Sequence, residues 1–448
     1  MSGINSVLDI GKSALLTHQL GIHISGHNIA NVNTPGYSRQ VLHLETKEPM
    51  SFTPGMLGMG VRGSEVRRIH DSYLLGQLNS EYQALGRWDA ESGVLERLEM
   101  ILSADEFNNS LCEFWNAWED LANNPSGLAE RAVVISRGEQ VVNIIQRIHS
   151  SIMQFKNAEV GAGVTATVEE INLLSEQIAD LNKKIISAEA VGQNANDFRD
   201  KQELLVRELS EKIDIDYFYD NEGQLNIIVC GMKPLVNGGN YFELSTQTRE
   251  GVQEVLWIDS EGESTVINQN ISGGSIKGNL VDLKSYIDRF DELAKNIIEC
   301  VNSIHSAGFG LDGSTGIDFF IGSSASGISV NPALVNDLNM IAASGTYEGL
   351  PGDNGNALAI ADLRYDSSIG DYFNSIVNDV GANLQKANSN AAHQSEMIVY
   401  MNNLRESVSG VSLDEEMISL IQYQHAYQSA AKLVAVADEL LRTVINMV

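Results

Sequence analysis

Residues 22–40 of the chain read IHISGHNIANVNTPGYSRQ, which is the end of a helix followed by a sharp turn. Upstream of the turn, aliphatic residues recur every seven positions, the spacing of a coiled-coil seam. These residues are Leu8, Leu15, Ile22 and Ile29. Proline disfavours a helical residue before it, and Pro-Gly favours a type II turn. The helix is therefore predicted to stop near Asn31, and the chain to turn at Asn33-Thr34-Pro35-Gly36.

The last segment of the chain repeats the pattern of the first. Its apolar residues follow a 3–4 rhythm, and those predicted to form a seam are Met417, Leu420, Tyr427, Val434, Leu441 and Ile445. In the first helix Gly11, Gly21 and Gly26 each cost about 1 kcal/mol relative to alanine in a helix interior. Since such a helix pair is marginal alone, we expect neighbouring copies to bury further faces of it and to order it in a polymer.

The stretch between the terminal helices is predicted to be mainly helical, with one β-rich interruption. Helical periodicity covers residues 69–102, 109–122, 126–158, 171–188, 196–212, 277–306 and 371–448. Short β-prone runs separated by turn residues fall at 215–219, 225–230, 241–244, 255–258 and 265–267. Residues 37–68 are expected to be extended and irregular, because four glycines interrupt them.

We therefore expect a mainly α protein with a small antiparallel β domain. It would be an elongated multi-domain subunit whose N- and C-terminal helices pair as a coiled coil. The predicted segments are 1–68 with the seam helix and turn, 69–213 helical, 214–270 β-rich, 271–370 helical with Gly/Ser-rich loops, and 371–448 returning to the N-terminus.

Composition excludes several classes of protein. The 448 residues carry a formal charge of −30, which repels nucleic acid and anionic lipid. No segment is apolar enough to insert in a membrane, and the N-terminus lacks the pattern of a cleaved signal. Cys112, Cys230 and Cys300 are too far apart for a CxxC site, and we expect them to be buried core residues.

Motifs for catalysis or cofactors are weak or absent. The sequence GMGVRG at 58–63 matches GxGxxG, but no predicted strand precedes it, and an extended connector is expected there. His23 and His27 have helical spacing without an HExxH motif, so exposed or interfacial positions are favoured over a metal site. Asp353-Asn354-Gly355 lacks the closing Glu of a calcium loop. We predict no catalytic residue, no cofactor and no metal. A secreted cell-wall hydrolase would need a cluster of partnered polar residues, which the sequence does not contain.

Two further features have competing interpretations. Trp115 and Trp118 could form a binding patch, but their spacing beside Phe114 and Leu121 favours packing in a core. Arg39 follows the turn directly. It could pair with an acidic residue of a neighbouring subunit or be simply solvated, and the sequence favours neither.

The turn and the C-terminal helix also carry a family resemblance. The motif residues are Asn28, Asn31, Asn33, Thr34, Pro35, Gly36, Tyr37, Ser38, Arg39 and Gln40. This motif resembles one shared by flagellar rod, hook and hook-associated proteins, and its ending SRQ is similar to the hook-associated protein 1 version. The runs LDEEM at 413–417 and LIQYQHAY at 420–427 are similar to the closing helix of that family. FWNAW at 114–118, VNSIHS at 301–306 and GDNGNALA at 352–359 agree as well.

The resemblance implies a structural subunit of the bacterial flagellum that polymerises through its terminal helices at the junction of hook and filament. Its partners would be further copies of itself in a ring, the hook protein, and a second junction protein on the flagellin side. An export chaperone would hold the C-terminal helix before type III secretion without cleavage. The chain would be cytoplasmic only transiently and then extracellular. A hook or distal-rod subunit is the nearest alternative.

Overall fold

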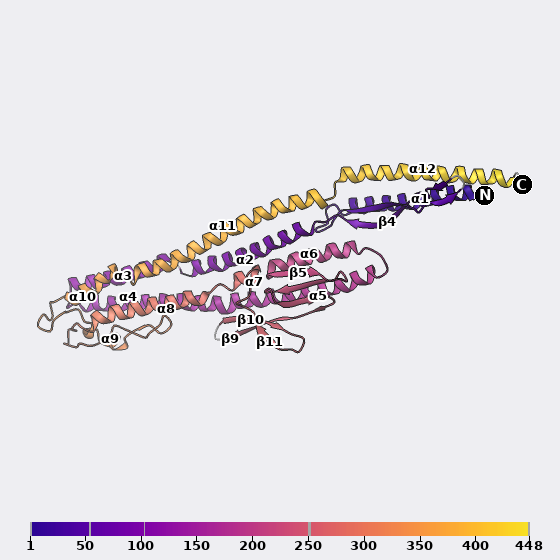
Figure 1. Ribbon diagram of the computed structural model, residues 1–448. Coiled ribbons are helices and arrows are strands. Elements are labelled where there is room, and N and C mark those ends of the chain that lie inside the picture. Colours follow the sequence, from indigo (N-terminus) through magenta and orange to yellow (C-terminus); the bar gives the residue numbers. More distant parts are fainter. Residues whose placement is uncertain (1, 53–54, 103, 250–251, 447–448) are drawn as a thin grey trace.

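The chain is a long, narrow molecule whose two termini lie at the same tip (Figure 1). The structure, a computed structural model, describes residues 2–52, 55–102, 104–249 and 252–446, so the predicted end positions Met1 and Val448 lie outside it. Long helices run along the molecule, and small antiparallel sheets lie on one side of them. The predicted fold class, mainly α and elongated with a small β portion, is confirmed.

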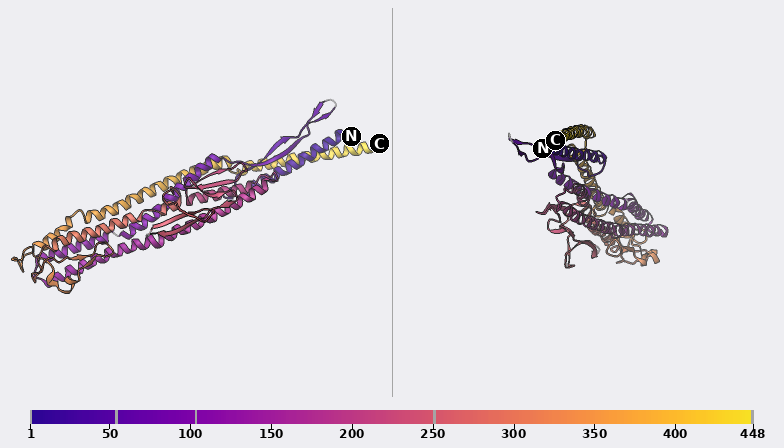
Figure 2. Two further views of the ribbon diagram at one scale, coloured as in Figure 1. Left: turned by 60° about the horizontal axis from the view of Figure 1, so that its bottom comes forward. Right: turned by 90° about the vertical axis from the view of Figure 1, so that its right-hand side faces the viewer.

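The tip consists of two antiparallel helices and a β-ribbon. Helix α1 (Ser2–Ala30) packs along α12 (Leu413–Asn446), as the two seam predictions require. Strand β1 (Gln40–Thr46) pairs antiparallel with β4 (Val61–Arg68), and β2 (Met50–Phe52) pairs with β3 (Gly55–Leu57) near the ribbon's end. The ribbon projects beside the helix pair (Figure 2).

The prediction that residues 37–68 are extended is confirmed by four strands, but the prediction that they are irregular is wrong. Gly63 lies inside β4, opposite Leu44, and a Cβ atom there would be 2.9 Å from Leu42 Cδ1. Gly60 adopts a φ of +86° and lies against Ile10 of α1. These glycines therefore permit close packing of a regular ribbon instead of breaking it.

A helical body follows the tip and contains the largest of the three hydrophobic cores of the described residues. Its principal helices are α2 (Ser72–Leu102), α3 (Ala104–Asn123), α4 (Leu128–Gln154), α8 (Leu283–His305), α10 (Gly355–Ala361) and α11 (Gly370–Ser409). Trp115 and Trp118 are buried in this core beside Phe114, so the prediction that they pack is confirmed. Apolar faces repeating at helical spacing produce this arrangement, because each helix buries one face against its neighbours.

The second core joins two helices to the β portion. Helices α5 (Gly161–Glu189) and α6 (Asn196–Lys212) pack beside a four-stranded sheet and a three-stranded sheet. The first sheet has β5 (Ile215–Tyr219), β6 (Leu225–Val229), β7 (Lys233–Asn237) and β8 (Asn240–Tyr241), and the second has β9 (Leu244–Arg249), β10 (Val252–Ile258) and β11 (Ser264–Val266). Strand β7 was missed because Lys233 and Pro234 weaken its β pattern.

One helical rod connects these two cores. Helix α4 continues through a π-helical turn, Phe155–Val160, into α5 without a loop. Phe155 belongs to the larger core and Val164 to the smaller one. At 1.5 Å per residue the rod is roughly 90 Å long, so it fixes the length of the body.

Two predicted helices are divided in the structure. The segment 277–306 splits into α7 (Gly274–Asn279) and α8, because Asp282 caps α8 by accepting a hydrogen bond from Ser285 N at 3.2 Å. The segment 371–448 splits at residues 410–412 into α11 and α12. The Gly/Ser-rich region holds β12 (Phe320–Ile321), β13 (Ser329–Val330) and α9 (Pro332–Asn336) between irregular loops.

The prediction of buried cysteines is wrong. Cys112 is exposed on α3, whereas Cys230 and Cys300 are half-buried. Cys112 lies one residue after the buried Leu111, on the side of the amphipathic helix that faces solvent.

Candidate functional site: the joint between the terminal helices and the body

Two glycines bring α12 into close contact with α1. A Cβ atom on Gly11 would lie 2.6 Å from Val434 Cγ2, and one on Gly21 would lie 2.7 Å from the ring of Tyr423. The ring centroids of His18 and Tyr423 are 6.2 Å apart. The glycines that lower helix propensity therefore make room for the partner helix.

The buried residues of α12 coincide only in part with the predicted seam. On α12 the buried or half-buried residues recur every seven positions at Glu416, Tyr423, Ala430 and Ala437, and Leu420, Val434 and Leu441 are half-buried, but Tyr427 is 37% exposed. Leu420, Val434 and Leu441 belong to the predicted seam, whereas the first four residues do not. Met417 and Ile445 are 54% and 67% exposed.

The predicted seam residues of α1 are likewise not the most buried residues of their helix. Leu8, Leu15, Ile22 and Ile29 are only half-buried, whereas Gly11 and Gly21 are buried. Sequence reasoning selected aliphatic positions, although the closest approach falls at small ones. Whether the predicted seam residues contact a neighbouring copy stays a prediction.

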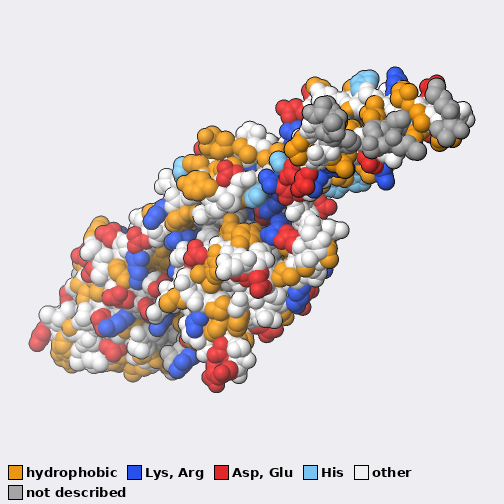
Figure 3. All heavy atoms as spheres, turned by 45° about the vertical axis from the view of Figure 1, so that its right-hand side comes forward, with side chains coloured by type: hydrophobic (Ala, Val, Ile, Leu, Met, Phe, Trp, Pro, Cys, Tyr) orange, Lys and Arg blue, Asp and Glu red, His pale blue; other side chains and the backbone are white. Residues whose placement is uncertain are grey.

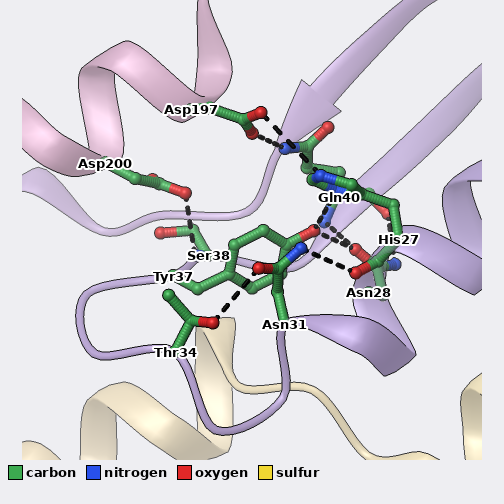
Figure 4. A network of polar contacts seen from close by, with 9 residues as sticks. All are labelled: His27, Asn28, Asn31, Thr34, Tyr37, Ser38, Gln40, Asp197 and Asp200. Carbon is green, nitrogen blue, oxygen red and sulfur yellow. Dashed lines mark hydrogen bonds and ion pairs between the residues drawn. The ribbon is translucent and has the colours of Figure 1, made fainter.

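Asn28 anchors the ribbon to the end of α1. Its side-chain amide donates to Gln40 O at 2.9 Å, and its Oδ1 accepts from Gln40 N at 3.0 Å (Figure 4). Asn28 is 1% exposed, and an amide is suited to this paired exchange because it carries a donor and an acceptor side by side. The side chain thereby makes the pair of backbone hydrogen bonds that a neighbouring strand would otherwise make.

The predicted turn is confirmed. Gly36 has a φ of +79°, as the third position of a type II turn requires, and Tyr37 N donates to Thr34 O at 3.2 Å. Thr34 Oγ1 donates to Asn31 Oδ1 at 3.1 Å, and Asn31 Nδ2 donates to His27 O at 3.0 Å. The end of α1 is therefore capped by its own turn. Asn33 and Pro35 are exposed on it.

Tyr37 folds back from the turn onto α1. Its hydroxyl donates to Asn28 Oδ1 at 2.7 Å and lies 3.0 Å from His27 Nδ1. Burial raises the pKa of Tyr37, and the carboxylates of Asp197, Asp200 and Glu416 raise it further. The phenol therefore stays protonated and available as a donor.

Carboxylates of α6 receive the turn and the ribbon. Asp200 accepts from Ser38 N at 2.9 Å and from Arg68 Nη1 at 3.0 Å. Arg68 Nη2 lies 2.5 Å from Glu203 Oε1. Burial lowers the pKa of Arg68, but Glu203 and Asp200 outweigh it and raise the pKa overall, as charge-assisted pairs do. This cluster joins the ribbon to the body at a site of which little reaches solvent.

Asp197, one turn before Asp200, makes the second contact of α6 with the tip. Its carboxylate accepts from Gln40 Nε2 at 2.7 Å and lies 3.8 Å from His27 Nε2. Figure 4 shows both acidic residues approaching the turn from the same helix. Gln40, the last motif residue, is thus held at its backbone by α1 and at its side chain by α6.

Arg39 connects the turn to the start of α12. Its Nε donates to Glu416 Oε1 at 2.7 Å, and its Nη1 donates to Glu415 Oε2 at 2.9 Å. Its backbone N–H donates at 3.0 Å to the carbonyl oxygen of Ser409, which is the last residue of α11. Neither expected role of Arg39 accounts for this, because its acidic partners belong to the same chain.

These contacts define what we call the joint: the turn at residues 27–40 with Arg68, Asp197, Asp200, Glu203 and Glu416. The joint attaches the tip to α6 and fixes the break between α11 and α12. It consists of hydrogen bonds and ion pairs that position these elements relative to one another. Sequence reasoning found the turn but not the acidic residues, which lie far away in the chain and among many other carboxylates.

The remaining sequence candidates serve the fold. Asp353 accepts hydrogen bonds from Ser344 Oγ and from the backbone of Gly345, so its carboxylate is engaged in ordering its own loop. His23 is exposed. Across the described ranges, no group of three or more His, Cys, Asp or Glu residues is arranged to hold a metal ion. None of the helices described is both long and apolar enough to cross a membrane.

Comparisons with known proteins agree with this architecture. Residues 95–320 match the model of the flagellar hook-associated protein FlgK helical domain, and residues 405–447 match that of the flagellar basal body rod FlgEFG protein C-terminal region. The flagellar hook-associated protein 1 of Bacillus subtilis (strain 168) is 29% identical, over 98% of this chain and 97% of its own length. The protein of that name from Escherichia coli (strain K12) is 22% identical, over 99% and 100%.

A solved structure shares the fold. The flagellar hook junction protein FlgK from Burkholderia pseudomallei superposes with a TM-score of 0.67 at 14% identity, covering 74% of this chain and 100% of that one. The helical-domain model alone matches about half of the chain. Its family consists of structural components of the flagellum and not of enzymes, and this chain belongs to it, the flagellar hook-associated protein 1 (FlgK) family.

Proposed function

We propose that this chain is the subunit between hook and filament, and that copies of it form a ring by packing their terminal helix pairs together. The observation that carries the proposal is the surface of α12. Apolar residues are exposed on several of its sides, namely Leu413, Met417, Ile418, Ile421, Leu433, Val436, Leu440 and Ile445. A helix that is apolar all round is normally buried, so these faces favour contact with further copies. Hydrophobic side chains are visible on the tip at the upper right of Figure 3.

The names of the relatives support the position in the flagellum. The Bacillus and Escherichia proteins are hook-associated, and the Burkholderia protein is a hook junction protein. We extend that position to this chain. Its neighbours would be the hook protein on one side and, on the other, a second junction protein that leads to flagellin.

The segments of the chain would have different roles in the assembly. Residues 1–68 and the last part of 371–448 would form the ring contacts, and the joint would hold them at a fixed angle to the body. Segments 69–213, 214–270 and 271–370 would form the outer layers. The chain would leave the cytoplasm through the flagellar type III export channel, with a chaperone covering the C-terminal helix until then.

Gold-labelled antibodies raised against the chain would test the position on sheared native flagella. We expect label at the single boundary where hook meets filament. Hooks from a strain that lacks the gene should carry no label and serve as the control for antibody specificity. Label along the whole hook or on the rod would instead identify a hook or rod subunit, and label along the filament would also contradict the proposal.

A further inference from the structure

A groove of about 480 Å³ runs between α1 and the β-ribbon. Its charged lining residues are Asp9, Lys12, Lys47 and Arg62, and its apolar ones include Leu16 and Leu20. Three of these four charged side chains are cationic, in a chain whose formal charge is −30. The groove is therefore a small basic surface on an acidic protein.

The two lysines of the groove are not neutralised within the chain. Arg62 pairs with Glu45 at 3.1 Å, but Lys12 and Lys47 form no side-chain ion pair with any of the residues described. Leu16 between them is 58% exposed. Exposed leucines flanked by free ammonium groups suit an amphipathic helix that carries a carboxylate.

Helix α12 presents such a surface on a flank of its contact with α1. Leu433, Val436 and Leu440 form an exposed stripe at helical spacing, and Leu440 is 52% exposed. Glu439 lies beside the stripe, and its carboxylate has no ion-pair partner in the described part of the chain. Val434 contacts α1 at Gly11 and Ala437 is buried, whereas Leu433 and Val436 beside them stay 39% and 53% exposed.

The groove and the stripe lie at the same level along the helix pair, on two different faces of it. Gly11 abuts Val434, which places Lys12 level with Leu433. Leu16 is about 140° around α1 from Gly11, and therefore faces away from α12. A contact between two different surfaces of identical subunits is head-to-tail. Such contacts close into a ring when the rotation from one subunit to the next permits it.

We propose that the groove receives α12 of a second copy of this chain. The neighbour's Leu433, Val436 and Leu440 pack on Leu16 and Leu20, and its Glu439 faces Lys12 and Lys47. This rests on the proposed function for its setting, a ring of copies, and names the contact within it.

Photo-crosslinking in assembled flagella tests the contact. The chain carrying p-benzoylphenylalanine in place of Leu16 is supplied to cells that lack the gene, and flagella are irradiated and digested for mass spectrometry. We expect a product of twice the subunit mass joining position 16 to residues 433–440. The matched control replaces Val133, which is exposed on α4 of the body. A crosslink from position 16 to another protein or to another part of the chain overturns the proposal, as does no crosslink from filament-bearing cells.

Charge reversal provides a second measurement. The double variant Lys12→Glu and Lys47→Glu should reduce the number of filaments per cell about fivefold, and adding Glu439→Lys should restore it. Lys295→Glu, on the exposed surface of α8, is the matched control and should have no effect. Normal filament numbers in the double variant contradict the groove contact but leave the junction role intact. If the chain is not the junction subunit at all, filaments should form on cells that lack it.

Discussion

Arg39 and Glu416 are 377 positions apart in the chain, yet Arg39 Nε and Glu416 Oε1 are 2.7 Å apart. Glu416 is 3% exposed, so its charge is stabilised chiefly by this guanidinium. The same arginine's backbone binds Ser409, which ends α11. One motif residue thus holds both sides of the break between the two C-terminal helices.

Replacing Arg39 by Ala should loosen α12 from the joint. The change leaves a buried carboxylate without its partner, which costs about 3 kcal/mol, at the low end for such pairs because Arg39 is partly exposed. Hydrogen exchange of residues 409–420 in the purified chain would measure it. Arg442→Ala removes an exposed pair with Asp438 and is the control. Equal exchange in both variants would show that the Arg39 pair does not hold the helix.

Replacing Asn28 by Leu should detach the start of the ribbon from α1. Gln40 would lose both of its backbone partners in a buried position, a loss of about 1–3 kcal/mol. Faster amide exchange at Gln40 and in β1 would report this. Asn33→Ala, at an exposed position of the same turn, should leave exchange unchanged. Unaltered exchange in the Asn28 variant would refute the anchoring role.

Two glycines of α1 should respond oppositely to alanine. At Gly21 a methyl group would lie 2.7 Å from the Tyr423 ring, so α12 must shift and the pair weakens. At Gly26 there is no atom within 4 Å, so alanine should stabilise the helix by about 1 kcal/mol. Hydrogen exchange of α1 and α12, measured at rising temperature, distinguishes the two variants. Similar shifts of the same sign would contradict the close contact at Gly21.

The stability of the body should fall on acidification through His305. Burial lowers the pKa of this 1% exposed histidine to about 4, and its Nε2 accepts from Ala342 N at 3.0 Å. Because the unfolded chain takes up the proton near pH 6.5, the contribution is complete above that pH and is lost between pH 6.5 and 4. The loss is about 3 kcal/mol.

Urea unfolding at pH 7 and pH 4.5 would measure this loss. The variant His305→Gln should be less stable at pH 7 but should lose less stability between the two pH values than the natural chain. The difference in pH dependence between the two chains gives the contribution of His305, because the contribution of the carboxylates is common to both. Identical pH dependence in both would mean that His305 does not remain neutral in the folded body.

Ending the chain at Ser412 should leave the body folded. Neither of the two larger hydrophobic cores contains a residue of α12, so their packing does not depend on it. Calorimetry of the shortened chain should retain the main unfolding transition within a few degrees of that of the full chain. Loss of that transition would show that α12 stabilises the body directly.

The sequence predicts elements that depend on local periodicity and turn chemistry. The helix at 196–212 coincides with α6, and Pro35 and Gly36 identified the turn that the structure contains. In these places a single local feature, an apolar face or a required positive φ, is enough to specify the structure.

The sequence does not predict features that depend on distant residues. The seam register is set by the close approach at Gly11 and Gly21, which contribute no hydrophobic signal. The ribbon depends on pairing between strands that glycines interrupt. Asp200 is one of 59 acidic residues, and no local property distinguishes it from the others before the chain folds.

The most direct test of the proposed junction role is electron microscopy of cells from which the gene is deleted, with flagellin assayed in the culture medium. We expect hooks without filaments and flagellin monomer shed into the medium, both reversed by restoring the gene. Normal filaments on motile cells would contradict it, and absent or malformed hooks would assign the chain to the hook or rod instead.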